Sequence, residues 1–113
     1  MSADVHAALV EHLLAHSVKR GSFRLKSGRP SDWFLDSKQT ACDPDGVQLM
    51  TAVASAVIPP DATAIGGMTV GADPVAYGIA AAGVAVGLRL RSFTIRKESK
   101  DHGVTGRVAG ALR

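Results

Sequence analysis

A short apolar strand, a glycine-rich turn and a proline-started helix follow one another in the middle of the chain, and this succession constrains the fold most. Ala62–Gly66 has the length and composition of a buried strand. Asp73-Pro74 signals a helix start, because the aspartate can cap open amides and proline suits the first helical turn. We expect this helix to reach about Ala82, with Gly83 as its C-terminal cap. A further strand at Leu88–Ile95 then predicts a helix crossover and a parallel sheet, as in α/β folds.

An amphipathic helix is expected near the N-terminus, from about Asp4 to His16, and Gly21 ends this unit. Its buried stripe is predicted to consist of Val5, Leu9, Leu13 and His16. His6 and His12 lie in or beside the same stripe. We interpret the three histidines as ordinary helix residues, because no acidic or thiol side chain is spaced to join them as metal ligands.

A hairpin and a second helix are expected next. Ser22–Lys26 and Asp32–Asp36 are short extended stretches separated by turn residues, which predicts an antiparallel hairpin. Asp43-Pro44 repeats the helix start signal, and Pro59-Pro60 stops this second helix. Its buried stripe is predicted to be Val47, Met50, Ala54 and Val57.

The composition excludes several classes of protein. A single cysteine, Cys42, allows no internal disulfide and is typical of a reducing compartment, so we expect a cytoplasmic protein. We read Cys42 as a small residue near a helix start. The longest uncharged run, Pro74 to Leu88, is shorter than the roughly 20 apolar residues of a membrane-spanning helix.

Charge is distributed unevenly along the 113 residues, whose net charge is +3. Residues 1–61 contain six basic and seven acidic side chains, whereas residues 62–113 contain seven basic and three acidic ones. Such a basic half suits a nucleic acid or a small polyanion. Nucleic-acid binding usually adds aromatic side chains among the basic ones, and this half has only Tyr77 and Phe93, so a small polyanion is favoured.

Three stretches could carry chemistry, and each also has a plain structural interpretation. The turn from Gly66 to Asp73 could present backbone amides to a phosphate, or it could be only a tight strand-to-helix turn. The segment from Ile95 to Arg107 could grip phosphate oxygens with its cations, or it could be a solvated loop. Lys26, followed by Trp33 and Phe34, could pair a charge with a planar ring, or it could belong to a hairpin with packed aromatics.

The same three stretches together resemble one family. FRLKSG at 23–28 with WFLD at 33–36 looks like the N-terminal hood of orotate phosphoribosyltransferases, GGMTVGADPVA at 66–76 resembles their first diphosphate loop, and IRKESKDHG at 95–103 is similar to their mobile catalytic loop. The resemblance covers about residues 5–113 and implies a type I phosphoribosyltransferase-like fold. In that fold a parallel sheet has helices on both faces. We expect one incomplete domain, with helix and hood at 1–42, the first half of the core at 43–113, and a mobile loop at about 96–107.

The resemblance also implies an activity: transfer of the phosphoribosyl group from phosphoribosyl diphosphate to orotate, giving orotidine 5′-monophosphate and diphosphate in pyrimidine synthesis. Phe34 and Leu35 would lie against orotate. Lys26, Lys100 and His102 would be catalytic, and Mg²⁺ would be bound mainly through substrate and water. A homodimer with shared active sites would be the functional unit. The residues implied to bind phosphoribosyl diphosphate are Lys26, Thr69, Val70, Gly71, Ala72, Arg96, Lys97, Lys100 and His102.

Two departures from the family pattern limit what is expected of these residues. The diphosphate loop has no lysine, which leaves backbone amides as its donors. Residues 1–113 also lack the family's ribose-phosphate motif, an apolar strand ending in paired acids before a Thr/Gly-rich loop. We therefore expect a domain truncated after the catalytic loop and inactive by itself. Another base phosphoribosyltransferase, a non-catalytic relative and a basic nucleic-acid-binding module remain as alternatives.

Overall fold

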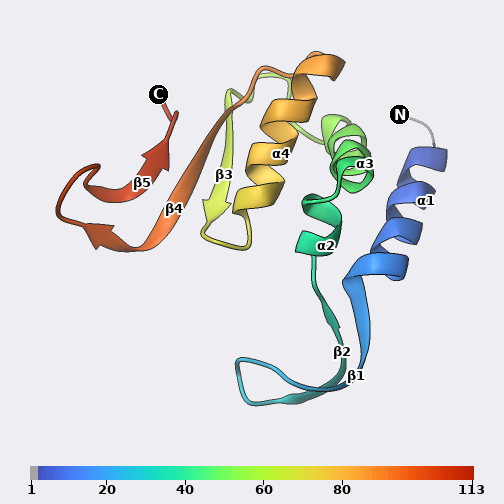
Figure 1. Ribbon diagram of the computed structural model, residues 1–113. Coiled ribbons are helices and arrows are strands. Elements are labelled where there is room, and N and C mark those ends of the chain that lie inside the picture. The colour runs from blue at the N-terminus through green and yellow to red at the C-terminus, as the bar shows by residue number, and fades with distance from the viewer. Residues whose placement is uncertain (1–2) are drawn as a thin grey trace.

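The computed structural model describes residues 3–113, and Figure 1 shows an α/β arrangement in layers. A small sheet lies on one side, helix α4 packs against it, and α3 and then α1 follow (Figure 1). A separate hairpin projects from below the helices. The predicted α/β class is confirmed. In chain order the elements are α1 Ala3–His12, η1 Leu13–Ser17, β1 Val18–Arg24, β2 Pro30–Leu35, α2 Lys38–Ala41, α3 Pro44–Ser55, β3 Ala64–Met68, α4 Asp73–Gly83, η2 Val84–Val86, β4 Arg91–Lys100 and β5 Gly106–Gly110.

The main sheet has three strands in the order β3-β4-β5 and mixed directions. β3 and β4 are parallel and joined through α4, as the crossover predicted, whereas β5 returns antiparallel to β4. Helices on both faces were expected. In the described part of the chain α4 is the only helix with substantial contact to the sheet, so a single face is covered.

The helix starts were predicted better than the helix ends. α3 begins as expected, with the Asp43 carboxylate accepting from the Gly46 amide at 2.9 Å. Asp73, in contrast, does not cap α4: it is the first helical residue, and its carboxylate accepts from side chains of neighbouring segments. Gly83 is not the C-terminal cap either, because it is helical and the chain continues into η2. Gly87, with φ +88°, supplies the left-handed residue that ends this helical run.

The N-terminal helix is confirmed, although it ends differently from the prediction. α1 passes into a π-helical turn that ends at Ser17, so Gly21 lies inside β1 and does not terminate the helix. The β1–β2 pairing is antiparallel, as predicted, and its register shifts by one residue between Arg20 and Phe23. Gly21, with φ +155°, lies in this bulge. Of the expected stripe, His16 is exposed.

The hydrophobic core is thin. Among the described residues, its buried apolar side chains are Ala41, Ala76 and Ile79. Val57 was expected in the buried stripe of α3, but α3 ends at Ser55 and Val57 is 76% exposed. The accessible surface is 7554 Å², against about 5,900 Å² for a typical folded monomer of 11.7 kDa. The chain therefore leaves more surface open than a self-contained domain of this size would. In the described residues no helix is both long and apolar enough to cross a membrane.

Candidate functional site

The ends of several elements face one side of the molecule. β3 points its carboxyl end to the side from which the β1–β2 hairpin projects, and the β3–α4 loop follows β3 there (Figure 1). In open α/β sheets ligands bind outside the carboxyl ends of the parallel strands. β1 and β2 make no substantial contact with β3, β4 or β5 in the described residues, so this side is open.

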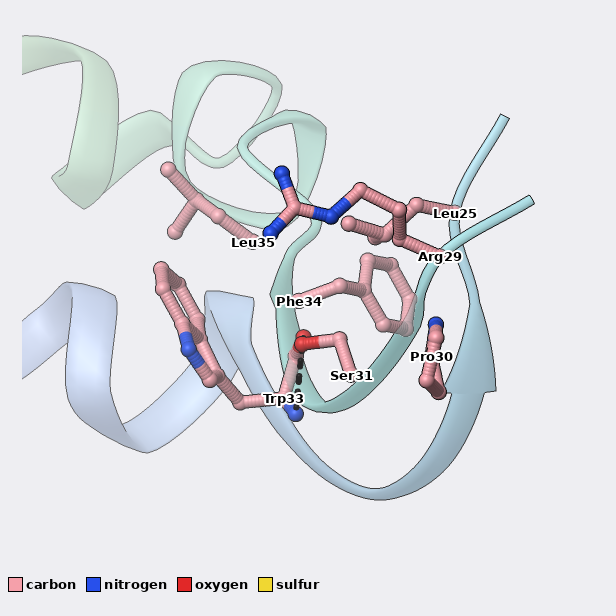
Figure 2. Close-up of a pocket in the computed structure, with 7 residues that line it drawn as sticks. All are labelled: Leu25, Arg29, Pro30, Ser31, Trp33, Phe34 and Leu35. Atoms are coloured by element: carbon pink, nitrogen blue, oxygen red, sulfur yellow. Dashed lines mark hydrogen bonds between the residues drawn. The ribbon is translucent and has the colours of Figure 1, made fainter. Parts of the chain in front are cut away.

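The β1–β2 hairpin carries a groove of about 650 Å³. Figure 2 shows the Arg29 side chain reaching toward Leu35 above the ring of Phe34, with Trp33 on the far side. The groove therefore combines apolar and aromatic surface with one guanidinium, which suits a planar anionic ligand. Its lining residues are Leu25, Arg29, Pro30, Ser31, Trp33, Phe34 and Leu35.

Local contacts within the hairpin build this groove. The rings of Phe23 and Phe34 meet edge to face, with centroids 4.7 Å apart, which fixes the Phe34 ring. The Ser31 hydroxyl donates to the Trp33 carbonyl at 2.6 Å and holds the start of β2 in place. At the turn, the Leu25 amide donates to the Arg29 carbonyl at 2.9 Å. The Arg29 side chain thus starts from an ordered position.

The sequence predicted part of this groove. Phe34 and Leu35, the expected orotate contacts, both line it. Lys26 does not: it is exposed at the hairpin turn. Trp33, named in the sequence as a planar ring that could act with Lys26, also lines the groove, whereas Arg29 was missed as a functional residue. Arg29 is one of the turn residues between the two extended stretches, although a guanidinium within a few residues of two aromatics is itself a signal for a planar anion.

Hydrogen bonds hold the β3–α4 loop against the sheet. The Thr69 amide donates to the Ile95 carbonyl at 3.0 Å, and the Thr69 hydroxyl donates to Asp73 at 2.6 Å. The second Asp73 oxygen accepts from the Thr94 hydroxyl of β4 at 2.9 Å, and Tyr77 bonds the same hydroxyl. The loop also contains a cis peptide bond between Thr69 and Val70.

Two backbone amides of this loop remain open. Ala72 and Asp73 donate within the loop, to Met68 and Val70 respectively. In the described residues the amides of Val70 and Gly71 have no protein acceptor, and both residues are exposed. These two amides are the donors that the loop can offer to an anion.

The three glycines of the turn, Gly66, Gly67 and Gly71, differ in what a side chain at each position would contact. A Cβ on Gly66 would lie 2.6 Å from the Phe93 ring, and one on Gly67 would lie 2.6 Å from the Ala72 Cβ, so packing alone requires both glycines. A Cβ on Gly71 would meet nothing within 4 Å, and its φ is not in the left-handed region. Packing and backbone conformation therefore leave Gly71 unexplained, which favours a ligand that approaches closely.

The segment expected as a loop at 96–107 forms a hairpin in large part, because β4 runs to Lys100 and β5 begins at Gly106. The Arg96 guanidinium donates to the carbonyls of Val104 and Gly106, at 2.7 and 3.1 Å. The Arg107 Nε donates to the Arg96 carbonyl at 3.0 Å. In this conformation Arg96 holds the hairpin together and does not extend toward a ligand.

The other predicted cations of this hairpin are open to solvent. Lys97 and Lys100 are exposed and have no ion-pair partner in the part of the chain described. The His102 Nδ1 lies 3.0 Å from an Asp101 carboxylate oxygen, and both side chains are more than four-fifths exposed. Gly103 and Gly106 take left-handed φ values of +65° and +83°, which the turn of the hairpin requires. These cations do not converge on one point with the β3–α4 loop here.

A partly buried polar cluster joins the helices to the base of the β1–β2 hairpin. We name it the junction cluster, and it consists of Asp43, His12, Thr40 and Ser17. The pKa of the Asp43 carboxyl is lowered, mainly because it accepts a hydrogen bond from the Gly46 amide and also because His12 lies beside it. Desolvation of the carboxylate acts in the opposite direction and raises the pKa. The sequence missed this cluster because His12 and Asp43 are 31 residues apart.

Known proteins identify the class to which this arrangement belongs. No protein-family model matches the chain. It is 36% identical over 108 residues to the orotate phosphoribosyltransferase of Streptomyces avermitilis, covering 95% of this chain and 59% of that protein. It superposes on Mycobacterium tuberculosis orotate phosphoribosyltransferase in complex with Fe(III) dicitrate with a TM-score of 0.76 at 28% identity, covering 96% of this chain and 61% of that one. For the same enzyme in complex with 5-phospho-α-D-ribosyl 1-diphosphate, the TM-score is 0.73 at 27% identity, over 96% and 57% of the two chains.

Fold and sequence together define a chain of the type I phosphoribosyltransferase class. Within that class its sequence is similar to orotate phosphoribosyltransferases over 95% of its own length. It spans about half to three-fifths of the length of the curated relatives that it matches.

Proposed function

We propose that this chain supplies the orotate-binding hairpin and the diphosphate-binding loops of an orotate phosphoribosyltransferase. The observation that carries the proposal is the groove of the β1–β2 hairpin, where Phe34 and Leu35 lie beside the Arg29 guanidinium. Orotate is a planar ring with a carboxylate. Its ring would stack against Phe34 and Leu35, and Arg29 would neutralise its carboxylate.

The chemistry asks the protein mainly to position and neutralise anions. As diphosphate leaves, C1 of the ribose becomes cation-like and a nitrogen of orotate attacks it. The chain would hold the leaving diphosphate with the open amides of Val70 and Gly71, and Thr69 and Ala72, whose amides donate within the protein, would flank the bound anion. Lys26, at the turn of the β1–β2 hairpin, would contact phosphoribosyl diphosphate between the two segments.

The β4–β5 hairpin would supply the mobile cations. Lys97 and Lys100, which have no ion-pair partner in the described residues, would neutralise diphosphate oxygens, and His102 would bind phosphate or move a proton. Arg96 would first have to release the carbonyls of Val104 and Gly106. This exchange would couple hairpin closure to arrival of the anion.

Mg²⁺ and a second subunit complete the proposal. The described residues contain no cluster of His, Cys, Asp or Glu side chains that could hold a metal. The ion would therefore reach the site on diphosphate and ribose oxygens with water. The large open surface supports a homodimer in which part of the β4–β5 hairpin serves the partner's site. A cytoplasmic location suits the single exposed cysteine.

Calorimetric titration of the 113-residue chain tests the proposal. We expect orotate to bind, with its affinity raised by phosphoribosyl diphosphate, and hypoxanthine to give no heat. We also expect no orotate-dependent release of diphosphate, because residues 1–113 lack the paired-acid ribose-phosphate motif. Binding of hypoxanthine in preference to orotate would point to another base. Tight binding of generic DNA or RNA at moderate salt, with no heat from orotate, would favour the hypothesis of a nucleic-acid-binding module over that of an enzyme.

A further inference from the structure

The junction cluster is a continuous chain of hydrogen bonds. Asp43 Oδ2 lies 3.0 Å from His12 Nε2, and His12 Nδ1 lies 3.0 Å from the Thr40 hydroxyl. The Thr40 hydroxyl lies 2.5 Å from the Ser17 hydroxyl. With the His12 proton on Nε2, His12 donates to Asp43, Thr40 donates to His12, and Ser17 donates to Thr40. Every buried side-chain polar atom of the cluster then has a partner, as holds for the described residues generally.

Burial makes this chain of bonds costly to disturb. Ser17 and Thr40 have no exposed surface and the His12 side chain is 12% exposed, whereas the Asp43 end of the cluster is 38% exposed. The neighbouring backbone is tightly packed, since a Cβ on Gly46 would lie 2.2 Å from the Thr40 carbonyl oxygen and 3.0 Å from His12 Cε1. Little room is left for water to replace a lost partner.

The cluster ends at the base of the β1–β2 hairpin. Ser17 is the last residue before β1, and its carbonyl accepts from the amide of Asp36, the first residue after β2, at 2.7 Å. Both arms of the hairpin therefore leave the body of the protein at Ser17. Because β1 and β2 make no substantial contact with the main sheet, this base is the main described attachment that sets where the hairpin groove lies.

We infer that His12 is a positioning residue of the orotate site. By bridging Asp43 at the start of α3 and Thr40 of α2, it fixes Ser17 and thereby the angle at which the groove faces the β3–α4 loop. The identity of the ligand, orotate, rests on the proposed function, whereas the role of His12 in positioning the hairpin does not. His12 is not among the lining residues of the groove and would take no part in the chemistry.

Native reporters make the geometry measurable without any ligand. Trp33, the single tryptophan, lines the groove, and Cys42, the single cysteine, is exposed between α2 and α3. A fluorescent acceptor on Cys42 therefore reports its distance from Trp33 by energy transfer. The variants are His12→Ala, His12→Gln, which keeps a donor for Asp43, and Thr40→Val, which keeps the shape but breaks the link to Ser17. The matched control is His6→Ala, on the exposed side of the same helix.

We expect His12→Ala and Thr40→Val to broaden and shift the Trp33-to-Cys42 transfer efficiency. We expect orotate affinity to fall about tenfold, the scale of one or two lost net hydrogen bonds. Binding of inorganic diphosphate should change less than twofold, His12→Gln should recover part of the loss, and His6→Ala should behave as the unchanged chain.

Three results would overturn the inference. The first is an unchanged transfer efficiency in folded His12→Ala and Thr40→Val. The second is parallel loss of orotate and diphosphate binding, and the third is failure of all three variants to fold; either of these would show a purely structural role. If the unchanged chain binds no orotate, the proposed function fails, while the transfer measurement still decides whether His12 positions the hairpin.

Discussion

Two alanine substitutions, Gly67→Ala and Gly71→Ala, separate packing from ligand binding in the β3–α4 loop. In Gly67→Ala the new Cβ would lie 2.6 Å from the Ala72 Cβ, whereas ordinary contact begins at 3.4 Å. One of these two Cβ atoms must move by about 0.8 Å. Ala72 cannot move freely, because its amide donates a hydrogen bond to the Met68 carbonyl and it lies at the start of α4. Overpacking of this kind costs about 1 to 3 kcal/mol. A domain of this size should then melt about 4 to 12 °C lower.

Gly71→Ala should give the opposite pair of results. The added methyl meets nothing within 4 Å and the backbone conformation suits alanine, so the free energy of unfolding should be unchanged or up to about 1 kcal/mol higher. The methyl would, however, stand on the open side of the loop beside the free amides. We expect affinity for inorganic diphosphate to fall about tenfold, a loss of about 1.4 kcal/mol.

Thermal denaturation followed by circular dichroism and calorimetric titration with diphosphate measure the two effects on the same samples. Equal melting temperatures for Gly67→Ala and the unchanged chain would refute the packing argument. Unchanged diphosphate affinity in Gly71→Ala would refute the assignment of this loop as an anion site.

Three further predictions concern single side chains. Because folding lowers the pKa of Asp43, this carboxylate contributes fully to stability above the unfolded value of 3.8, and the contribution is lost as the pH falls through the folded pKa. Asp43→Asn should therefore lower the stability at pH 7 and make stability, measured by urea denaturation, depend less on pH in the acid range. An unchanged acid dependence would contradict the lowered pKa of Asp43. Arg29→Ala should weaken orotate binding about tenfold and Arg29→Lys somewhat less, with Arg20→Ala as the control, whereas equal effects of Arg29→Ala and the control would remove Arg29 from the site. Lys100→Ala should lower diphosphate affinity and reduce its dependence on salt, measured by titration at two ionic strengths, while Lys38→Ala on α2 should leave both unchanged.

The sequence predicted those parts of the fold that depend on local signals. Asp43-Pro44 is a local start signal and α3 begins there, and the turn residues after Lys26 correctly placed a hairpin. Asp73-Pro74 has the same pattern, but the Asp73 carboxylate bonds Thr69 and Thr94 in place of the helix amides. Competition from a neighbouring strand decided that case, and no local pattern reports it.

Long-range pairing explains most of what the sequence missed in the candidate site. The charges and glycines of residues 96–107 indicated a loop, because β5 could be recognised only from its antiparallel pairing with β4. Similarly, His12 looked like an ordinary helix residue until the fold placed Asp43 beside it. The groove residues Phe34 and Leu35 were found through resemblance, whereas Arg29 needed the three-dimensional arrangement of the hairpin.

The hairpin form of the segment after Ile95 has a consequence for the entropy of binding. Fixing the backbone of one flexible residue costs roughly 1 to 2 kcal/mol. Residues already held in β4 or β5 have met that cost during folding, which leaves the turn at 101–105 as the part outside the strands. When this segment closes over a bound substrate, a smaller part of the binding free energy is therefore needed to order the chain. More of that energy remains for holding the departing diphosphate, and reopening needs only the same few residues to loosen.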